Sequence, residues 1–154
     1  EIDEAIADAM PLSMSINAWE GHWPLNTYAR DMDRTRLSES AQNRLAQAEK
    51  MTQEEYQDLL VERERIRGSY GGLAGGFDLC ISLTAPGAAP KGLGWTGDPS
   101  FVVPGSLLGV PAISLPVLTA EDNMPLGLQL LGFINHDAKL FAAAAAILPL
   151  FEDQ

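Results

Sequence analysis

The sequence predicts an α/β fold in which a β-sheet lies between helices. Residues 1–67 hold 22 of the 31 charged side chains, whereas residues 68–151 hold only seven, so the second part resembles a protein interior. That part contains two apolar runs, PAISLPV at 111–117 and PLGLQLLG at 125–132. Neither run alternates clearly between apolar and polar residues, as a half-exposed strand does. We therefore expect strands with both faces covered.

The first part of the chain is expected to be helical. Its first buried stripe recurs at spacings of four, three and four residues: Leu12, Ile16, Trp19 and Trp23. Pro24 is expected to end or kink this helix. A second helix is predicted over residues 38–49. Thr52 and Glu55 form a capping box that starts a third helix, because each side chain can satisfy a free backbone N–H.

From Phe77 onward the pattern changes to strands and loops. FDLCISLT at 77–84 is typical of a strand, and the Gly- and Pro-rich segment at 85–100 predicts a long loop. A short helical turn is expected at 104–109, and a closing helix at 137–148. We divide the chain into a helical segment, residues 1–76, that packs on the sheet, and a strand–loop–strand–strand–helix segment, residues 77–154. Together they are expected to form one domain or a domain fragment.

Composition excludes several classes of partner. A net charge of −11 argues against a nucleic-acid partner, which requires a basic face. The chain has neither a Lys/Arg cluster nor an apolar run of about 20 residues, so no membrane association is expected. Cys80 is the only cysteine, which favours a reducing, cytoplasmic location. His22 and His136 have no acidic or thiol neighbours at ligand spacing, so no metal site is expected.

Other signals have simpler explanations. GLGWTG at 92–97 matches the dinucleotide motif G-x-G-x-x-G, but prolines flank it where that motif needs a strand and a helix. Cys80 lies in an apolar strand and is interpreted as a buried hydrophobe. Trp95 and Phe101 flank the long loop at the end of a strand, where open α/β sheets place ligands. They either line a pocket or anchor the loop.

Several motifs in series resemble one family. FDLCISLTAPGAAP, TGDPSF, SLLGVPAISLP and MPLGLQLLGF, followed by an alanine-rich helix, resemble the C-terminal part of amidase signature enzymes in order and spacing. The resemblance covers Phe77 to about Leu148 and extends more loosely to the helix that begins TQEEYQDLL. It implies the C-terminal portion of an amidase signature fold, with a mixed β-sheet covered by helices on both faces.

The resemblance also implies a chemistry. Amidase signature enzymes hydrolyse carboxamides with a serine nucleophile, a cis-peptide serine and a lysine, and need no metal or cofactor. Those three residues precede the matching part of the family. Lys50, Lys91 and Lys139 lie in other contexts, and no Gly/Ser-rich oxyanion loop is found. No catalytic residue is therefore assigned, and this chain by itself is expected to be inactive.

What the resemblance does imply is a substrate-binding wall on the acyl side. It comprises Thr84, Pro86, Trp95, Thr96, Phe101 and Ser106. LTAPG replaces the family's usual TPT, and Gly105 stands where relatives often carry a bulky aromatic residue. Gly105 is expected to leave room for a larger substrate, or to leave the wall incomplete. Gln129 matches the family's GLQ and is interpreted as structural.

Two functions follow from this sequence. In the first, the chain is the C-terminal fragment of an amidase-type C–N hydrolase whose partner is a small-molecule amide, and it contributes the pocket wall and part of the core sheet. In the second, it is a noncatalytic interaction module or pseudoenzyme-like relic. That relic binds a partner or forms a homo-oligomer through an exposed sheet edge.

Overall fold

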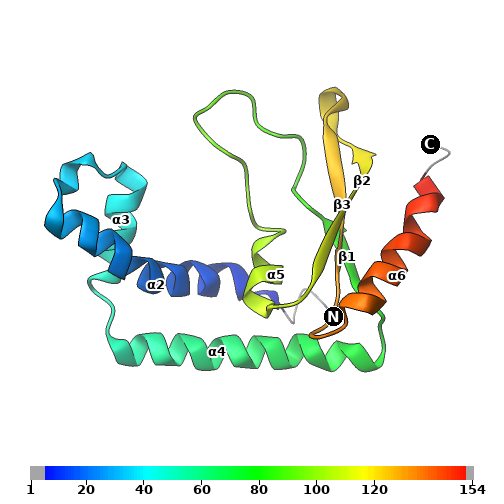
Figure 1. The fold of residues 1–154 in the computed structure, drawn as a ribbon, viewed down its shortest axis with the longest axis horizontal. Helices are drawn as coiled ribbons and strands as arrows, with labels where there is room; N and C mark the ends of the chain where they lie inside the picture. The colour runs from blue at the N-terminus through cyan, green and yellow to red at the C-terminus, as the bar shows by residue number, and fades with distance from the viewer. Residues whose placement is uncertain (1–5, 152–154) are drawn as a thin grey trace. The chain divides into compact units, whose positions relative to one another are not determined.

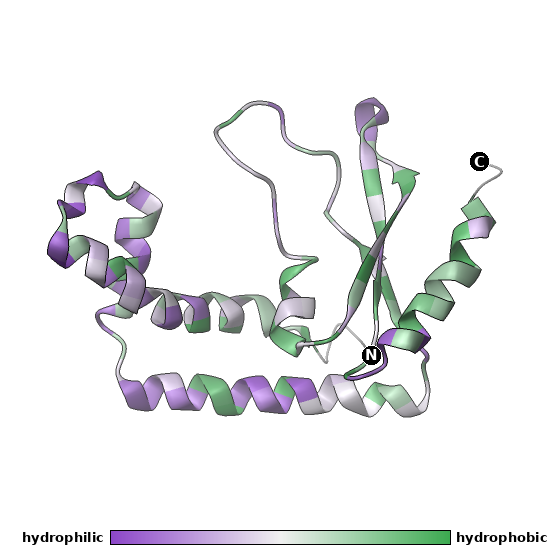
Figure 2. Ribbon diagram, viewed as in Figure 1, coloured by the Kyte–Doolittle hydropathy of each residue, from purple (hydrophilic) through white to green (hydrophobic). Residues whose placement is uncertain are grey.

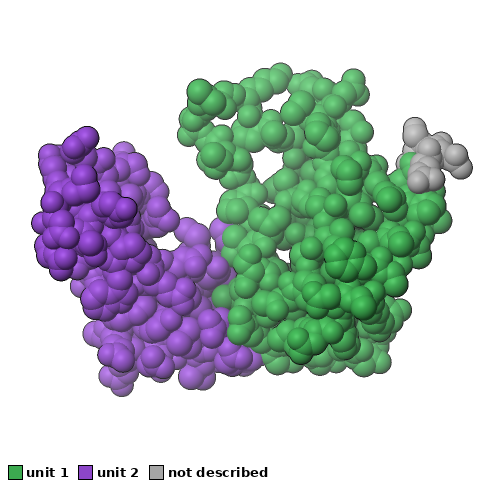
Figure 3. All heavy atoms as spheres, viewed as in Figure 1, with its two compact units in different colours: residues 1–7, 66–154 green, residues 8–65 purple. Residues whose placement is uncertain are grey.

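The computed structural model describes residues 6–151, and contacts divide the chain into two compact units. Unit 2 is Asp8–Arg65, and unit 1 is Glu1–Ala7 with Ile66–Gln154. Figure 1 labels the elements, and Figure 3 colours the two units. The boundary lies inside helix α4 (Gln53–Gly71), before the change in composition at Phe77. The division into residues 1–76 and 77–154 stays a prediction.

Unit 2 consists of helices with clear local start signals. Its elements are α2 (Ala9–Asp31), the short 3-10 turn η1 (Arg34–Arg36), α3 (Glu39–Ala48) and the first part of α4. The Ser38 hydroxyl accepts a hydrogen bond from the backbone N–H of Ala41 and so caps α3. The predicted capping box is confirmed, since Thr52 N–H donates to Glu55 Oε2 at 2.6 Å and Glu55 N–H donates to Thr52 Oγ1 at 3.2 Å.

Helix α2 differs from its prediction in two ways. It continues through Pro24 to Asp31, so the expected end at Pro24 is wrong. Proline removes only one helical hydrogen bond, and the packing of α2 against α3 compensates for that loss. Trp23 is 62% exposed and lies outside the buried stripe, which includes Leu12 and Ile16.

Unit 1 contains a three-stranded sheet. Its strands are β1 (Cys80–Leu83), β2 (Ala112–Thr119) and β3 (Pro125–Leu131), in the order β1-β3-β2. Around them lie η2 (Gly72–Gly75), α5 (Val103–Leu108), η3 (Glu121–Asn123), α6 (Asp137–Ile147) and η4 (Leu148–Phe151). The strands, the short turn and the closing helix predicted after Phe77 are therefore confirmed as elements.

The strand pairing corrects the expected mixed sheet. Both strand pairs in the described part of the chain are antiparallel. The β2–β3 pair forms because the acidic break between the two apolar runs makes a tight turn, in which Asp122 and Asn123 adopt left-handed φ angles of 58° and 56°. In the shared register, Ser82 of β1 and Ser114 of β2 both lie opposite Gln129 of β3.

Helix α6 covers one face of this sheet. Leu115 and Leu130 form a buried cluster with Leu140 and Ala144 of α6. On the opposite face of β2, every second residue is exposed among the described residues: Ala112, Ser114 and Pro116. Helix α5 reaches this second face only at Leu131 of β3, so the expectation that helices cover both faces is met only in part among the described residues. The exposed side chains on this face are small rather than charged. The run therefore looked apolar throughout, which led to the expectation that both of its faces are buried.

Helices α4 and α5 contact each other beside the same sheet. Arg67 Nε donates to the Leu107 carbonyl at 2.9 Å, which satisfies one of the free carbonyls at the end of α5. Tyr70 is buried, its ring lies 5.2 Å from that of Phe133, and its hydroxyl donates to the Gly132 carbonyl at 3.1 Å. Burial, and secondarily a hydrogen bond with Cys80, raises the pKa of Tyr70 above its ordinary value.

The hydropathy of the residues differs between helices α4 and α6 (Figure 2). Helix α4 alternates between hydrophilic and hydrophobic residues, whereas α6 is hydrophobic over most of its length. Within the described residues, none of the helices combines the length and apolar character that crossing a membrane requires.

Candidate functional site

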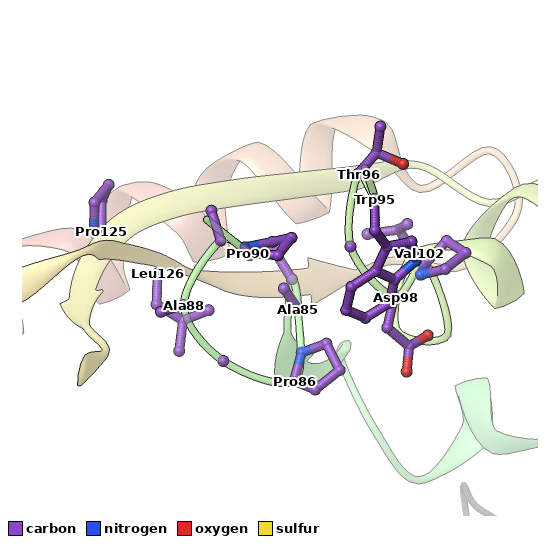
Figure 4. Close-up of a pocket in the computed structure, with 15 residues that line it drawn as sticks. Ala85, Pro86, Ala88, Pro90, Trp95, Thr96, Asp98, Val102, Pro125 and Leu126 are labelled. Carbon is purple, nitrogen blue, oxygen red and sulfur yellow. The ribbon is translucent and has the colours of Figure 1, made fainter. Parts of the chain in front are cut away.

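A hollow of about 690 Å³ lies between the long loop that follows β1 and the start of β3. Figure 4 shows Trp95 and Asp98 on one side of it and Pro125 and Leu126 on the other. Its volume falls within the range of about 300–1,000 Å³ that is usual for small-molecule sites. The lining residues are mostly small or apolar: Thr84, Ala85, Pro86, Gly87, Ala88, Ala89, Pro90, Trp95, Thr96, Gly97, Asp98, Pro99, Val102, Pro125 and Leu126.

Thr84 attaches the first end of the loop to β3. Its backbone N–H donates to the Gly127 carbonyl at 3.0 Å, and its hydroxyl accepts from the Gly127 N–H at 3.1 Å. Gly127 has no space for a side chain, because a Cβ there would lie 2.7 Å from Thr84 Oγ1 and would also collide with Ser114 Oγ. Thr84 therefore continues the β1–β3 pairing with a side chain as well as with its backbone.

Gln129 attaches the second end of the loop. Its buried side-chain Nε2 donates to the Phe101 carbonyl at 2.8 Å and to Ser82 Oγ at 2.9 Å. Both amide protons are thus used, one within the sheet and one on the loop. The interpretation of Gln129 as structural is consistent with these contacts.

Between these two ends the loop is exposed. Gly92 and Gly97 have φ angles of 95° and 107°, which favour glycine, and Leu93 is fully exposed. Lys91 Nζ lies 2.9 Å from Asp122 Oδ2 at the β2–β3 turn. Both side chains are highly exposed, so this ion pair contributes little stability. The loop is held firmly at its ends and weakly at its middle.

The structure brings four of the six predicted wall residues to this hollow. Thr84, Pro86, Trp95 and Thr96 line it. Phe101 lies beyond the lining and contributes its backbone carbonyl to the Gln129 contact. Ser106 lies in α5 and is exposed, also outside the lining. Whether the four bind a substrate stays a prediction.

Sequence reasoning missed part of the lining. Pro125 and Leu126 begin β3 and reach the hollow because β3 runs between β1 and β2. The apolar run at 125–132 predicted the strand, but no local signal indicated which loop it would face. Asp98, the one ionisable residue in the lining, was visible in the sequence as part of the loop.

The expectation that Gly105 leaves room for a larger substrate is wrong. This residue is buried, and a Cβ there would lie 3.0 Å from Leu131 Cδ2 of β3. Its missing side chain lets α5 approach the sheet closely and does not enlarge the hollow.

Metal-ligating side chains do not gather in one place among the described residues. In the part of the chain that the structure describes, no three His, Cys, Asp or Glu side chains are placed to hold a metal ion. His22 belongs to unit 2, where its Nδ1 is buried without a hydrogen-bond partner among the described residues. The lining offers mainly apolar surface, together with the side chains of Thr84, Thr96 and Asp98.

Comparison with known proteins gives a partial match. Fatty acid amide hydrolase of Medicago truncatula is 32% identical over 135 residues, which is 80% of this chain and 22% of that protein. One component of the glutamyl-tRNA(Gln) amidotransferase of Aliarcobacter butzleri (strain RM4018) is 34% identical over 91 residues, 55% of this chain and 20% of that component. The chain is a partial match to the amidase signature family.

A solved structure supports the fold of this chain. The crystal structure of an amidase superposes with a TM-score of 0.82 at 24% identity, over 93% of this chain and 35% of the amidase. No model of a known protein family matches the chain. The chain thus spans about a fifth of the curated relatives and about a third of the solved one.

Proposed function

We propose that this chain is the C-terminal portion of an amidase-type C–N hydrolase and walls the acyl side of its substrate pocket. The observation that carries the proposal is the hollow in the segment related to amidases, with four residues expected from the family's acyl wall in its lining. The chain supplies part of the core sheet and no nucleophile. Its substrate is a small carboxamide, and the reaction uses no metal or cofactor.

The arrangement of the loop supports a positioning role. Thr84 and Gln129 hold the two ends of the loop on β3, which fixes where the apolar lining between them begins and ends. An apolar wall anchored in this way can orient the acyl group of an amide for attack by a nucleophile held elsewhere. In the assembled hydrolase, further strands and helices extend the sheet into a mixed one and cover the face that Ala112, Ser114 and Pro116 expose.

The test is ammonia release from simple carboxamides. The purified chain is expected to release none above the uncatalysed background. A longer polypeptide, in which the family's lysine- and serine-bearing segment precedes Glu1, is expected to release ammonia. In that polypeptide Trp95→Ala should lower kcat/KM about tenfold, and Trp23→Ala, which alters an equally exposed tryptophan of unit 2, should not. Activity of the chain alone, or indifference to Trp95→Ala, would contradict the proposal.

A second candidate is a noncatalytic interaction module. It is favoured by apolar side chains left on the surface of unit 1, where Ile81 is 55% and Phe141 is 66% exposed. The short edge strand β1, which is free of proline and charge, could pair with another chain. Light scattering tests this candidate: a stable dimer that loses its association in Ile81→Asp supports it, and a folded monomer opposes it. A cytoplasmic location suits either function, given the single Cys80.

A further inference from the structure

The charges of the hollow restrict what it can accept. Of the fifteen residues that line it, Asp98 is the only ionisable one, and no lysine, arginine or histidine is among them. A carboxylate that leaves water needs such a partner, since an unpaired buried charge is costly. The lining therefore contains no cationic side chain that could pair with a bound carboxylate.

The charged side chains around the hollow also disfavour a bound anion. Asp98 Oδ1 accepts a hydrogen bond from the Ser100 N–H, and the carboxylate is exposed at the rim. Glu121 Oε2 lies 3.7 Å from where a Cβ on the lining residue Gly87 would stand. Lys91, the cation of this loop, is already paired with Asp122. An incoming anion therefore meets an acidic rim on a chain whose net charge is −11.

The lining also has a positive preference. Four prolines, three alanines and Trp95 present apolar surface without flexible side chains. Trp95 is 62% exposed, so its ring is accessible to a ligand. Apolar walls of short, stiff side chains with one accessible indole favour a planar or aliphatic ligand group over a ligand group that keeps its water shell.

We propose that the hollow accepts amides whose acyl group is uncharged and apolar, and that it rejects amides whose acyl group carries a carboxylate. This inference rests on the proposed function, because it assumes that the hollow is the acyl pocket. It adds the substrate class: neutral aryl or alkyl carboxamides.

Two amides of matched shape test the inference on the full chain. 4-Methylbenzamide and 4-carboxybenzamide share the amide and the ring, and they differ by one negative charge. The indole N–H signals of the tryptophans in ¹H–¹⁵N NMR spectra report binding, and Trp95→Phe identifies the Trp95 signal. Trp23 provides an internal control, because it is also 62% exposed and belongs to unit 2.

The expected result is a saturable shift of the Trp95 signal with 4-methylbenzamide, and affinity for 4-carboxybenzamide that is at least about fivefold weaker. Asp98→Asn should reduce that difference, and Asp137→Asn, which removes a carboxylate outside the lining, should leave it unchanged. Equal affinity, or tighter binding of 4-carboxybenzamide, would overturn the proposed substrate class without contradicting the proposed pocket wall. If neither amide moved Trp95 more than Trp23, the proposed pocket wall itself would be wrong.

Discussion

The two units differ in where their hydrogen-bonded polar side chains lie. In unit 2, polar side chains pair at the surface: Arg34 forms two hydrogen bonds with Glu49, at 2.9 and 3.0 Å, and Tyr56 donates to Glu20 at 2.8 Å. In unit 1 the buried side chains of Gln129 and Tyr70 make uncharged hydrogen bonds on the sheet, beside exposed ion pairs such as that of Lys91 with Asp122. The surface pairs remain hydrated, whereas the contacts on the sheet replace water.

This difference indicates what each unit is sensitive to. Exposed ion pairs contribute little stability and weaken with salt and with acid. Buried contacts depend on shape, because a small change in volume leaves a cavity or a collision. We therefore expect unit 1 to respond to changes in packing and unit 2 to changes in solution conditions, and three substitutions test this.

The largest effect is expected from Leu130→Ala. Leu130 is fully buried between β3 and α6, so truncation should lower the free energy of unfolding by about 3 kcal/mol. Leu93→Ala is the matched control, because Leu93 is fully exposed in the loop and should change stability by less than about 0.5 kcal/mol. Urea unfolding measures both. Equal losses would mean that α6 does not pack on the sheet as described.

A smaller effect is expected from Gly127→Ala. The added methyl group would collide with Thr84 and Ser114, which should cost about 2 kcal/mol and loosen the first end of the loop. Gly94→Ala serves as control, since a Cβ at Gly94 meets nothing within 4 Å. Thermal unfolding compares the two variants. If Gly127→Ala were as stable as the parent chain, Thr84 would not hold the loop tightly.

The smallest effect is expected from Glu49→Gln in unit 2. The hydrogen bond from Arg34 lowers the pKa of Glu49, so the folded chain binds fewer protons at this site than the unfolded chain. The contribution of the pair is then complete above the ordinary glutamate pKa of about 4.3 and is lost as the pH falls through the lower pKa of the folded state.

Unfolding by urea at several pH values measures this contribution. The parent chain and Glu49→Gln should differ slightly at pH 7 and converge below about pH 4. Asp58→Asn removes another exposed carboxylate of unit 2, one without an ion pair among the described residues, and should change the free energy of unfolding at pH 7 less than Glu49→Gln does. A difference that persisted in acid and in about 1 M salt would show that the ion pair is not its source, because Glu49 is then protonated and the pair is screened.

Local signals predicted most elements correctly. The Thr52 and Glu55 capping box, the strands after Phe77 and the closing helix all depend on residues close together in the chain. Helix α2 does not end at Pro24, one of the two outcomes expected there, because its packing outweighs the cost of proline within the helix. Gly105 was misjudged because its neighbour, Leu131, lies on a strand distant in sequence.

The candidate site was predictable only in part. The loop and four of its lining residues could be named from the sequence, whereas Pro125 and Leu126 could not. Pro125 and Leu126 reach the hollow because β3 is the middle strand of the sheet, and the sequence alone does not reveal the strand order.

The amino-acid sequence by itself determined the helices, the strands, the glycine-rich loop and the likeness to amidases, because each depends on short-range pattern or on direct similarity. The tertiary structure alone decided the antiparallel order β1-β3-β2, the uncovered face of β2 and the shape of the hollow. The physical reason is that strand pairing, helix packing and cavity walls join residues far apart in the chain. No local preference specifies which of them meet.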